Sequence, residues 1–197
     1  MTIGAVVLLP GFDIMGLHDS KILTEHERET AYAALMATPH LFATVVEVSA
    51  ADIDADRIGR AWRKGMLQAL RSVIASRPPG SIKYAVIDGN ATVSLDGVQV
   101  ECCEKGDRKF VGIAAAATLA KVTRDRQMVE LAQRPEYAPF KSVFENSKAY
   151  GSDVHMKMIK SGQYTDVHRR SFNPLQSCLQ TSPGYPRTPT CERSSTA

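Results

Sequence analysis

Short apolar segments alternate with amphipathic stretches along most of the chain. The apolar segments are rich in β-branched residues and end at Pro, Gly or polar residues, which is typical of buried strands. The predicted strands are residues 3–9, 44–48, 84–87 and 98–103. The intervening stretches have apolar residues at i+3 and i+4 spacing or a capping box, and they predict helices. Strands that alternate with helices predict an α/β fold.

Three helices are clearest in the first two thirds of the chain. They cover residues 24–36, where Thr24 and Glu27 form a capping-box pair, residues 55–75, and a long alanine-rich stretch at 111–134. After Pro135 we expect loops and one short helix at about 152–160. From Asn173 onward, Pro, Ser, Thr and Gly occur without a period, which predicts disorder. We therefore expect one domain at residues 1–172 and a disordered tail at 173–197.

The composition is that of an ordinary globular chain. With 197 residues, of which 44% are hydrophobic, it is long enough to bury a core. No apolar run approaches the roughly 20 residues needed to cross a bilayer, and the apolar start lacks a basic region and a cleavage site. Four cysteines at 102, 103, 178 and 191 form neither a CxxC motif nor a disulfide framework. We expect a cytoplasmic monomer that does not bind membranes.

The charge is unevenly distributed. Residues 105–170 contain 13 Lys or Arg against 7 Asp or Glu, so this stretch carries +6 and the remainder carries −3 of the net +3. A basic half favours a partner rich in phosphate, although solvated basic faces are also common.

Asp88 is the first candidate for chemistry. It follows the apolar strand at 84–87 directly, and α/β folds place their sites at the carboxyl ends of strands. Gly89 lets the backbone turn and leaves room for a ligand. The alternative is an ordinary turn, because Asp-Gly-Asn is turn chemistry anywhere.

Asp125 is the second candidate. It lies in the predicted long helix, where Lys121, four residues earlier, shares its face, so a local ion pair is the plain alternative. Hard divalent cations such as Mg²⁺ or Mn²⁺ prefer carboxylate oxygens, and phosphodiester hydrolysis by metals places such carboxylates beside basic groups. Asp88 and Asp125 together therefore suggest a metal site that cuts nucleic acid.

Two further side chains have alternative interpretations. Tyr150 lies beside Gly151 and close to Lys148, a combination suited to stacking on a base or sugar, and equally typical of a half-buried surface tyrosine. His168 could contact phosphate or could pack within a loop.

Six motifs in series resemble those of bacterial ribonuclease HII. They are Gly16-Leu-His-Asp-Ser-Lys21, Ile87-Asp-Gly-Asn90, Lys105-Gly-Asp107, Ala114-Ala-Ala-Ala-Thr-Leu-Ala-Lys-Val-Thr-Arg-Asp125, Tyr150-Gly-Ser152 and His168-Arg-Arg-Ser-Phe172. The resemblance covers about residues 3–175.

The resemblance implies a ribonuclease H-like mixed sheet flanked by helices, and cleavage of RNA in RNA–DNA hybrids or at ribonucleotides embedded in DNA. It implies that Asp88 and Asp125 are two of four metal-binding carboxylates, for Mg²⁺ or Mn²⁺. It implies that Tyr150 packs against a deoxyribose. Four basic residues would support the nucleic-acid backbone or the geometry of the site: Lys21, Lys121, Arg169 and Arg170.

The chain departs from the family pattern at its start. Members of the family open with a strand that ends in Asp-Glu and a Gly-Arg-Gly turn, and nothing similar precedes Ile3 or occurs later. We therefore expect the central first strand of the sheet to be missing, together with two metal ligands. A chain with half of its carboxylates is expected to cleave little. A hybrid-binding relic without catalysis is the alternative.

Overall fold

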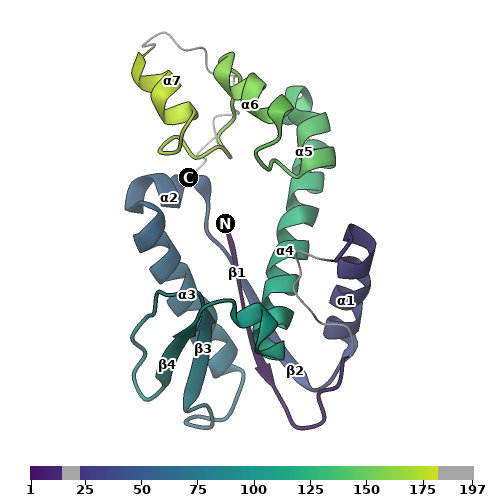
Figure 1. Cartoon of the computed structure of the whole chain (residues 1–197), viewed down its shortest axis with the longest axis vertical. Coiled ribbons are helices and arrows are strands. Elements are labelled where there is room, and N and C mark those ends of the chain that lie inside the picture. The colour runs from purple at the N-terminus through teal and green to yellow at the C-terminus, as the bar shows by residue number, and fades with distance from the viewer. Residues whose placement is uncertain (15–22, 182–197) are drawn as a thin grey trace, which may run out of the picture. The chain divides into compact units, whose positions relative to one another are not determined.

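The computed structural model describes residues 1–14 and 23–181 (Figure 1). Contacts divide the chain into two compact units: Met1–Val48 with Gly59–Arg124, and Ser49–Ile58 with Asp125–Ala197. Lys21 lies outside the described residues, as does the tail from residue 182. None of the described helices is both long and apolar enough to cross a membrane.

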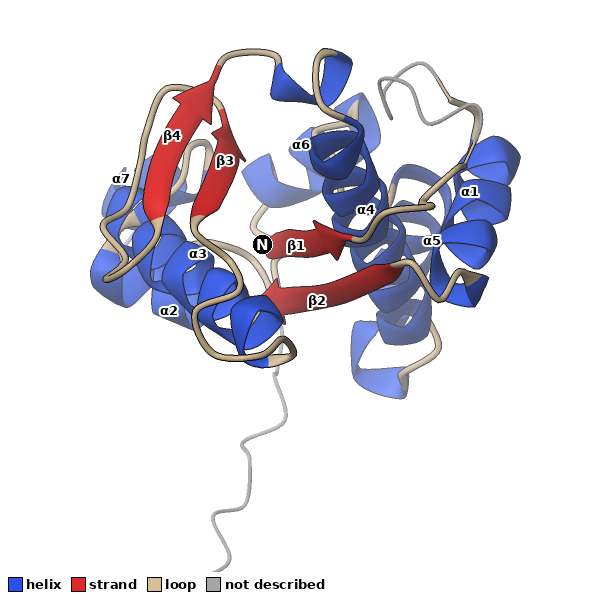
Figure 2. Cartoon of the chain, turned by 90° about the horizontal axis from the view of Figure 1, so that it is seen from below, coloured by secondary structure: helices blue, strands red, loops and turns tan. Residues whose placement is uncertain are grey.

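The first unit contains two separate pairs of strands. β1 (Thr2–Leu8) pairs antiparallel with β2 (Leu41–Glu47), and β3 (Tyr84–Asp88) pairs parallel with β4 (Gln99–Cys103). Figure 2 shows the two pairs apart, with β1 and β3 as the inner strands. The α/β class is confirmed, and the four predicted strands are present. The expected break at the centre of the sheet is also present, because no described strand joins the two pairs.

Helices of the first unit pack against these strands. α1 (Glu25–Ala37) begins at Thr24, whose side chain accepts from the Glu27 N–H while the Glu27 carboxylate accepts from the Thr24 N–H, so the predicted capping box is confirmed. α1 contributes Leu35 to a core shared with Ala115 and Leu119. α3 (Ile58–Ala75) buries one face.

The long helix α4 (Val111–Ala132) begins in the first unit and ends in the second. Its alanine-rich start allows close approach of β1, since a Cβ added to Gly4 would lie 2.2 Å from the carbonyl oxygen of Ala116. The Thr2 hydroxyl donates to the Ala120 carbonyl at 3.0 Å. The small residues at this crossing therefore let the strand pack closely against the helix.

The second unit is helical in its described part. It contains α2 (Ala50–Asp56), the 3₁₀ segments after α4 at Pro135–Phe140, and three short helices: α5 (Lys141–Ser147), α6 (Asp153–Lys160) and α7 (Leu175–Thr181). Phe140 and Phe144 are fully buried in its main core.

Three predictions differ from the structure. The helix expected at 55–75 is present as α3 but begins at Ile58, because Arg57 adopts a φ of 63° and separates it from α2. The loops expected after Pro135 contain α5, since Phe140 and Phe144 at i+4 spacing share a buried face. The prediction of disorder from residue 173 onward is wrong for residues 175–181. They form α7, and Leu175 is buried against Ile159 and Tyr164.

Candidate functional site

Asp88 is the last residue of β3 and its side chain is exposed. The Gly106 N–H donates to its Oδ1 at 2.8 Å, and this bond fixes one carboxylate oxygen. Gly89 follows with a φ of 100°, a conformation that favours glycine, and its N–H donates to the Cys103 carbonyl at 3.0 Å. The turn therefore extends the parallel ladder by one bond and then leads away from Asp88.

Gly106 also lies close to its neighbours. A Cβ there would lie 2.5 Å from Cδ1 of Ile113 and 3.3 Å from Oδ1 of Asp88. The absence of a side chain lets the turn that follows β4 come close to the end of β3. The Lys105-Gly-Asp107 motif thus has a structural reason, which is to bring a backbone donor to Asp88.

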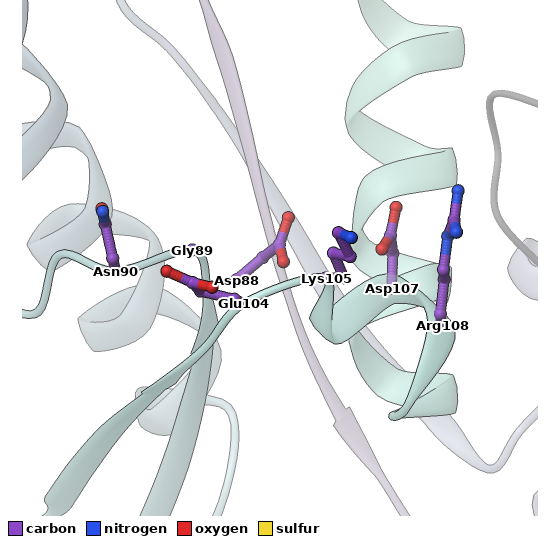
Figure 3. A pocket seen from close by; sticks show the side chains of 7 residues that line it. All are labelled: Asp88, Gly89, Asn90, Glu104, Lys105, Asp107 and Arg108. Atoms are coloured by element: carbon purple, nitrogen blue, oxygen red, sulfur yellow. The ribbon is translucent and has the colours of Figure 1, made fainter.

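An open pocket of about 420 Å³ surrounds this carboxylate (Figure 3). Its lining combines three acidic with two basic side chains and an amide: Asp88, Gly89, Asn90, Glu104, Lys105, Asp107 and Arg108. Asp107 is buried, and Asp88 projects from the end of its strand. The sequence pointed to Asp88 here but not to Glu104 or Asp107, which become neighbours of Asp88 only through the pairing of β3 with β4.

Asp125 lies in α4 and is 7% exposed, so it is a buried carboxylate rather than a solvated one. Lys121, one turn earlier, is half-buried. Asp88 belongs to the first compact unit, whereas Asp125 begins the part of α4 assigned to the second. Among residues 1–14 and 23–181, no three His, Cys, Asp or Glu side chains gather as ligands for a metal ion.

Tyr150 is 44% exposed in the loop between α5 and α6. Lys148 and Ala149 precede it with φ values of 50° and 55°, which residues with a side chain rarely adopt. The Tyr150 N–H donates to the Ser147 carbonyl at 2.9 Å, and the Tyr150 carbonyl accepts from the Ser152 N–H at 2.7 Å. The loop thus holds its backbone in a defined conformation and leaves the aromatic side chain partly in solvent.

Arg169 and Arg170 are both exposed, and Asp54 of α2 anchors the segment that carries them. The Arg170 N–H donates to one carboxylate oxygen of Asp54 at 2.8 Å. The Ser171 N–H and hydroxyl donate to the other at 2.9 and 2.5 Å. Burial by itself would raise the pKa of Asp54, but the bonds from Ser171 and Arg170 outweigh it and hold the pKa below 3.8. Asp54 is therefore an ionised anchor for this basic segment.

His168 is packed rather than directed to solvent. It is 9% exposed and lies 5.1 Å, centroid to centroid, from the Phe140 ring. Its Nε2 is 2.9 Å from Nε2 of His155. Of the two interpretations that the sequence allowed, the structure supports the packed loop residue.

Comparisons with known proteins agree with this geometry. The family model described as Ribonuclease HII matches residues 3–175. The chain belongs to the ribonuclease HII family. Ribonuclease HII from Polynucleobacter necessarius subsp. necessarius (strain STIR1) is 38% identical over 90% of this chain and 87% of its own length. The one from Bacillus subtilis (strain 168) is 37% identical over 88% of this chain and 63% of its own length.

Two solved structures show the same fold. The ribonuclease H2 from Pyrococcus horikoshii OT3 has a TM-score of 0.64 at 21% identity, covering 92% of this chain and 98% of that one. The ribonuclease HII in a PCNA complex from Archaeoglobus fulgidus has a TM-score of 0.60 at 20% identity, covering 81% and 77%. The ribonuclease H-like fold and the family drawn from the six motifs are thus confirmed, although the two strand pairs stay separate here.

Proposed function

We propose that this member of the ribonuclease HII family recognises RNA–DNA hybrids and ribonucleotides embedded in DNA, and that it is built for metal-dependent cleavage of the RNA strand. Membership of the family supports the class of reaction. The second compact unit supplies the observation that carries the proposal. In it the loop with an exposed tyrosine is held by the buried His155, and the segment with two exposed arginines is held by the half-buried Asp54.

Tyr150 and the arginines supply complementary chemistry for this substrate. An exposed aromatic ring can pack on a sugar or base, while guanidinium groups bind phosphate. Arg170 is anchored at its backbone by Asp54, so its side chain does not have to hold the segment in place. We propose Tyr150 as the residue that contacts the deoxyribose, and Arg169 and Arg170 as backbone contacts. Lys121 and Lys21 are proposed for the same role on the resemblance alone.

For cleavage we propose Asp88 and Asp125 as ligands of Mg²⁺ or Mn²⁺. A divalent ion bound by carboxylates lowers the pKa of a bound water and neutralises charge on the phosphate. Asp88 has the right donor chemistry, since one oxygen is fixed by Gly106 in a pocket with basic side chains. The described residues nevertheless do not fit a complete site, because they form no group of three ligands.

This shortage of ligands favours binding over catalysis in the chain as it stands. We expect residues 1–197 to bind a hybrid without metal and to cleave it weakly or not at all. Binding without cleavage is the second candidate function, and it is favoured by the lack of a group of three metal ligands among the described residues.

The proposal is tested by measuring binding and cleavage on one duplex. A fluorescent DNA duplex with a single ribonucleotide is titrated with purified chain in EDTA, and anisotropy reports affinity. Tyr150→Ala should weaken binding by about tenfold, the lower part of the range for losing one stacked base or sugar. Tyr150→Phe, which keeps the ring, is the matched control and should bind like the wild type.

The same duplex is then incubated with Mg²⁺ or Mn²⁺ and resolved on a denaturing gel. Any cleavage should disappear in Asp88→Asn and in Asp125→Asn, while the affinity measured in EDTA stays within about twofold. Equal affinity of wild type and Tyr150→Ala would contradict the recognition role. Metal-dependent cleavage that survives both carboxylate substitutions would contradict the assignment of the ligands.

A further inference from the structure

A pair of buried histidines links the two parts of the proposed nucleic-acid surface. His155 lies in α6 and His168 directly precedes Arg169. They are 5% and 9% exposed. Their Nε2 atoms are 2.9 Å apart, and their rings pack edge to face at 5.1 Å. Phe140, fully buried, contacts both rings at 6.5 and 5.1 Å between centroids.

The partners of each ring determine where its proton lies. The Thr165 N–H donates to Nδ1 of His168 at 3.0 Å, so this nitrogen carries no proton. Burial, with His155 adjoining, lowers the pKa of His168 to about 4, so the ring is neutral at pH 7. A neutral imidazole has one N–H, which in His168 must then be on Nε2.

The direction of the remaining bonds follows from this proton. Nε2–H of His168 donates to Nε2 of His155, which must therefore be unprotonated. His155 consequently carries its proton on Nδ1 and donates it to the carbonyl oxygen of Tyr150 at 3.0 Å. Each step from Thr165 through both rings to Tyr150 thus joins a donor to an acceptor, and the Thr165 hydroxyl, 2.9 Å from Nδ1 of His168, can donate to the same nitrogen. We name this series of bonds the histidine relay.

The relay ends on a loop that needs support. The Tyr150 carbonyl accepts from His155 and from the Ser152 N–H, so both of its lone pairs are used. The two residues before Tyr150 adopt positive φ, a conformation that persists only where surrounding structure holds it. Loss of the His155 bond would leave one hydrogen bond on this carbonyl.

We propose that His155 and His168 are positioning residues that fix Tyr150 relative to the Arg169–Arg170 segment, so that ring and guanidinium groups are presented to the nucleic acid together. What Tyr150 contacts rests on the proposed function, whereas the relay itself does not. The alternative is that the two rings only fill the core formed with Phe140 and Phe144.

The first test measures the tautomers directly. Long-range ¹⁵N–¹H correlation spectra of the full chain at neutral pH, assigned with single histidine substitutions, report which nitrogen of each ring is protonated. The relay requires opposite tautomers, Nδ1–H in His155 and Nε2–H in His168. Finding the same tautomer in both rings, or either ring charged at neutral pH, would overturn it.

The second test separates the hydrogen bond from the packing. In His155→Asn the side-chain amide can replace Nδ1–H as donor to Tyr150, whereas His155→Leu fills the space without a donor. His155→Leu should bind the ribonucleotide duplex about fivefold more weakly, the factor for one net hydrogen bond. His155→Asn should stay within about twofold. Leu175→Ala, which removes a buried side chain of another cluster, controls for destabilisation and should keep wild-type affinity.

A double substitution ties the effect to Tyr150. In a Tyr150→Ala background, His155→Leu should cause no further loss of affinity, because the relay then positions no ring. A full additional loss would overturn the positioning role. An equal loss of affinity in His155→Asn and His155→Leu would also overturn it, and would show that the two rings only fill the core.

Failure of the proposed function gives a different result from failure of the relay. If the wild type binds no duplex, the proposed function fails, and the relay is judged by the tautomers and by amide exchange at Gly151. That exchange should be faster in His155→Leu than in His155→Asn. If the Leu variant does not fold, the tautomers and the affinity of the Asn variant decide.

Discussion

Replacing Asp54 with alanine should loosen the segment that carries both arginines. Asp54 accepts three hydrogen bonds, from the Arg170 N–H and from the Ser171 N–H and hydroxyl. These donors lie 116 and 117 residues away from Asp54 in the chain. Alanine removes all three acceptors and leaves two backbone donors to be satisfied by water. The change acts within one compact unit, because both α2 and the arginine segment belong to the second.

The size of the effect follows from these bonds. A hydrogen bond to a charged group contributes about 1.5–3 kcal/mol when it is well buried. Asp54 is only half-buried, so water competes with its partners and we assign about 0.5–1 kcal/mol to each bond. The expected loss in the free energy of unfolding is therefore about 2 kcal/mol at neutral pH.

The pH dependence of folding stability tests the same three hydrogen bonds in a second way. The folded pKa of Asp54 lies below its unfolded value of 3.8, so its stabilisation is fully present above that value and is lost as the pH falls through the folded pKa. The stability difference between wild type and Asp54→Ala should accordingly shrink in acid.

Urea unfolding followed by circular dichroism measures both effects, and anisotropy in EDTA measures the consequence for duplex binding. Asp52→Ala is the control on the same helix, since Asp52 forms a capping box with Ser49 at the start of α2. It should cost about 1 kcal/mol and leave affinity unchanged. A change in stability of only about a few tenths of a kcal/mol in Asp54→Ala, or an equal loss of affinity in both variants, would show that Asp54 does not anchor the arginine segment.

Three glycine substitutions and one pH dependence test the packing. Gly4→Ala should destabilise by at least about 3 kcal/mol in urea unfolding, because its Cβ would meet backbone atoms of Ala116. Gly59→Ala, in a helix with open space, should stabilise by about 0.5–1 kcal/mol. Gly106→Ala should cost about 1–3 kcal/mol. The depressed pKa of His168 makes the unfolded chain bind more protons, so stability should rise by about 3 kcal/mol from pH 4 to 6.5, and less in His168→Gln. Stability independent of pH in this window would contradict the burial of His168.

Local signals in the sequence predicted most elements. The Thr24 and Glu27 pair marked the start of α1 because a capping box satisfies backbone donors within one turn. The apolar runs marked all four strands. The break at Arg57 had no such signal, because arginine favours helices and only the fold imposes its positive φ.

Long-range partners could not be predicted in the same way. Asp54 bonds to Arg170, 116 residues away in the chain, and His155 bonds to His168, 13 residues away. Neither separation matches a local spacing that a sequence pattern could reveal. The spacing of Phe140 and Phe144 could have revealed α5, since i+4 aromatics indicate a buried helical face. The separation of the two strand pairs was expected from the family pattern rather than from periodicity, which does not report which strands pair.

Binding and cleavage of a duplex with a single ribonucleotide, measured on residues 1–197, decide whether the chain recognises such a substrate and whether it cuts it. We predict binding in EDTA that weakens with salt and is about tenfold weaker in Tyr150→Ala, with little or no cleavage when Mg²⁺ or Mn²⁺ is added. Rapid metal-dependent cleavage would contradict the expectation of weak cleavage. Binding insensitive to Tyr150→Ala would contradict the assigned recognition surface.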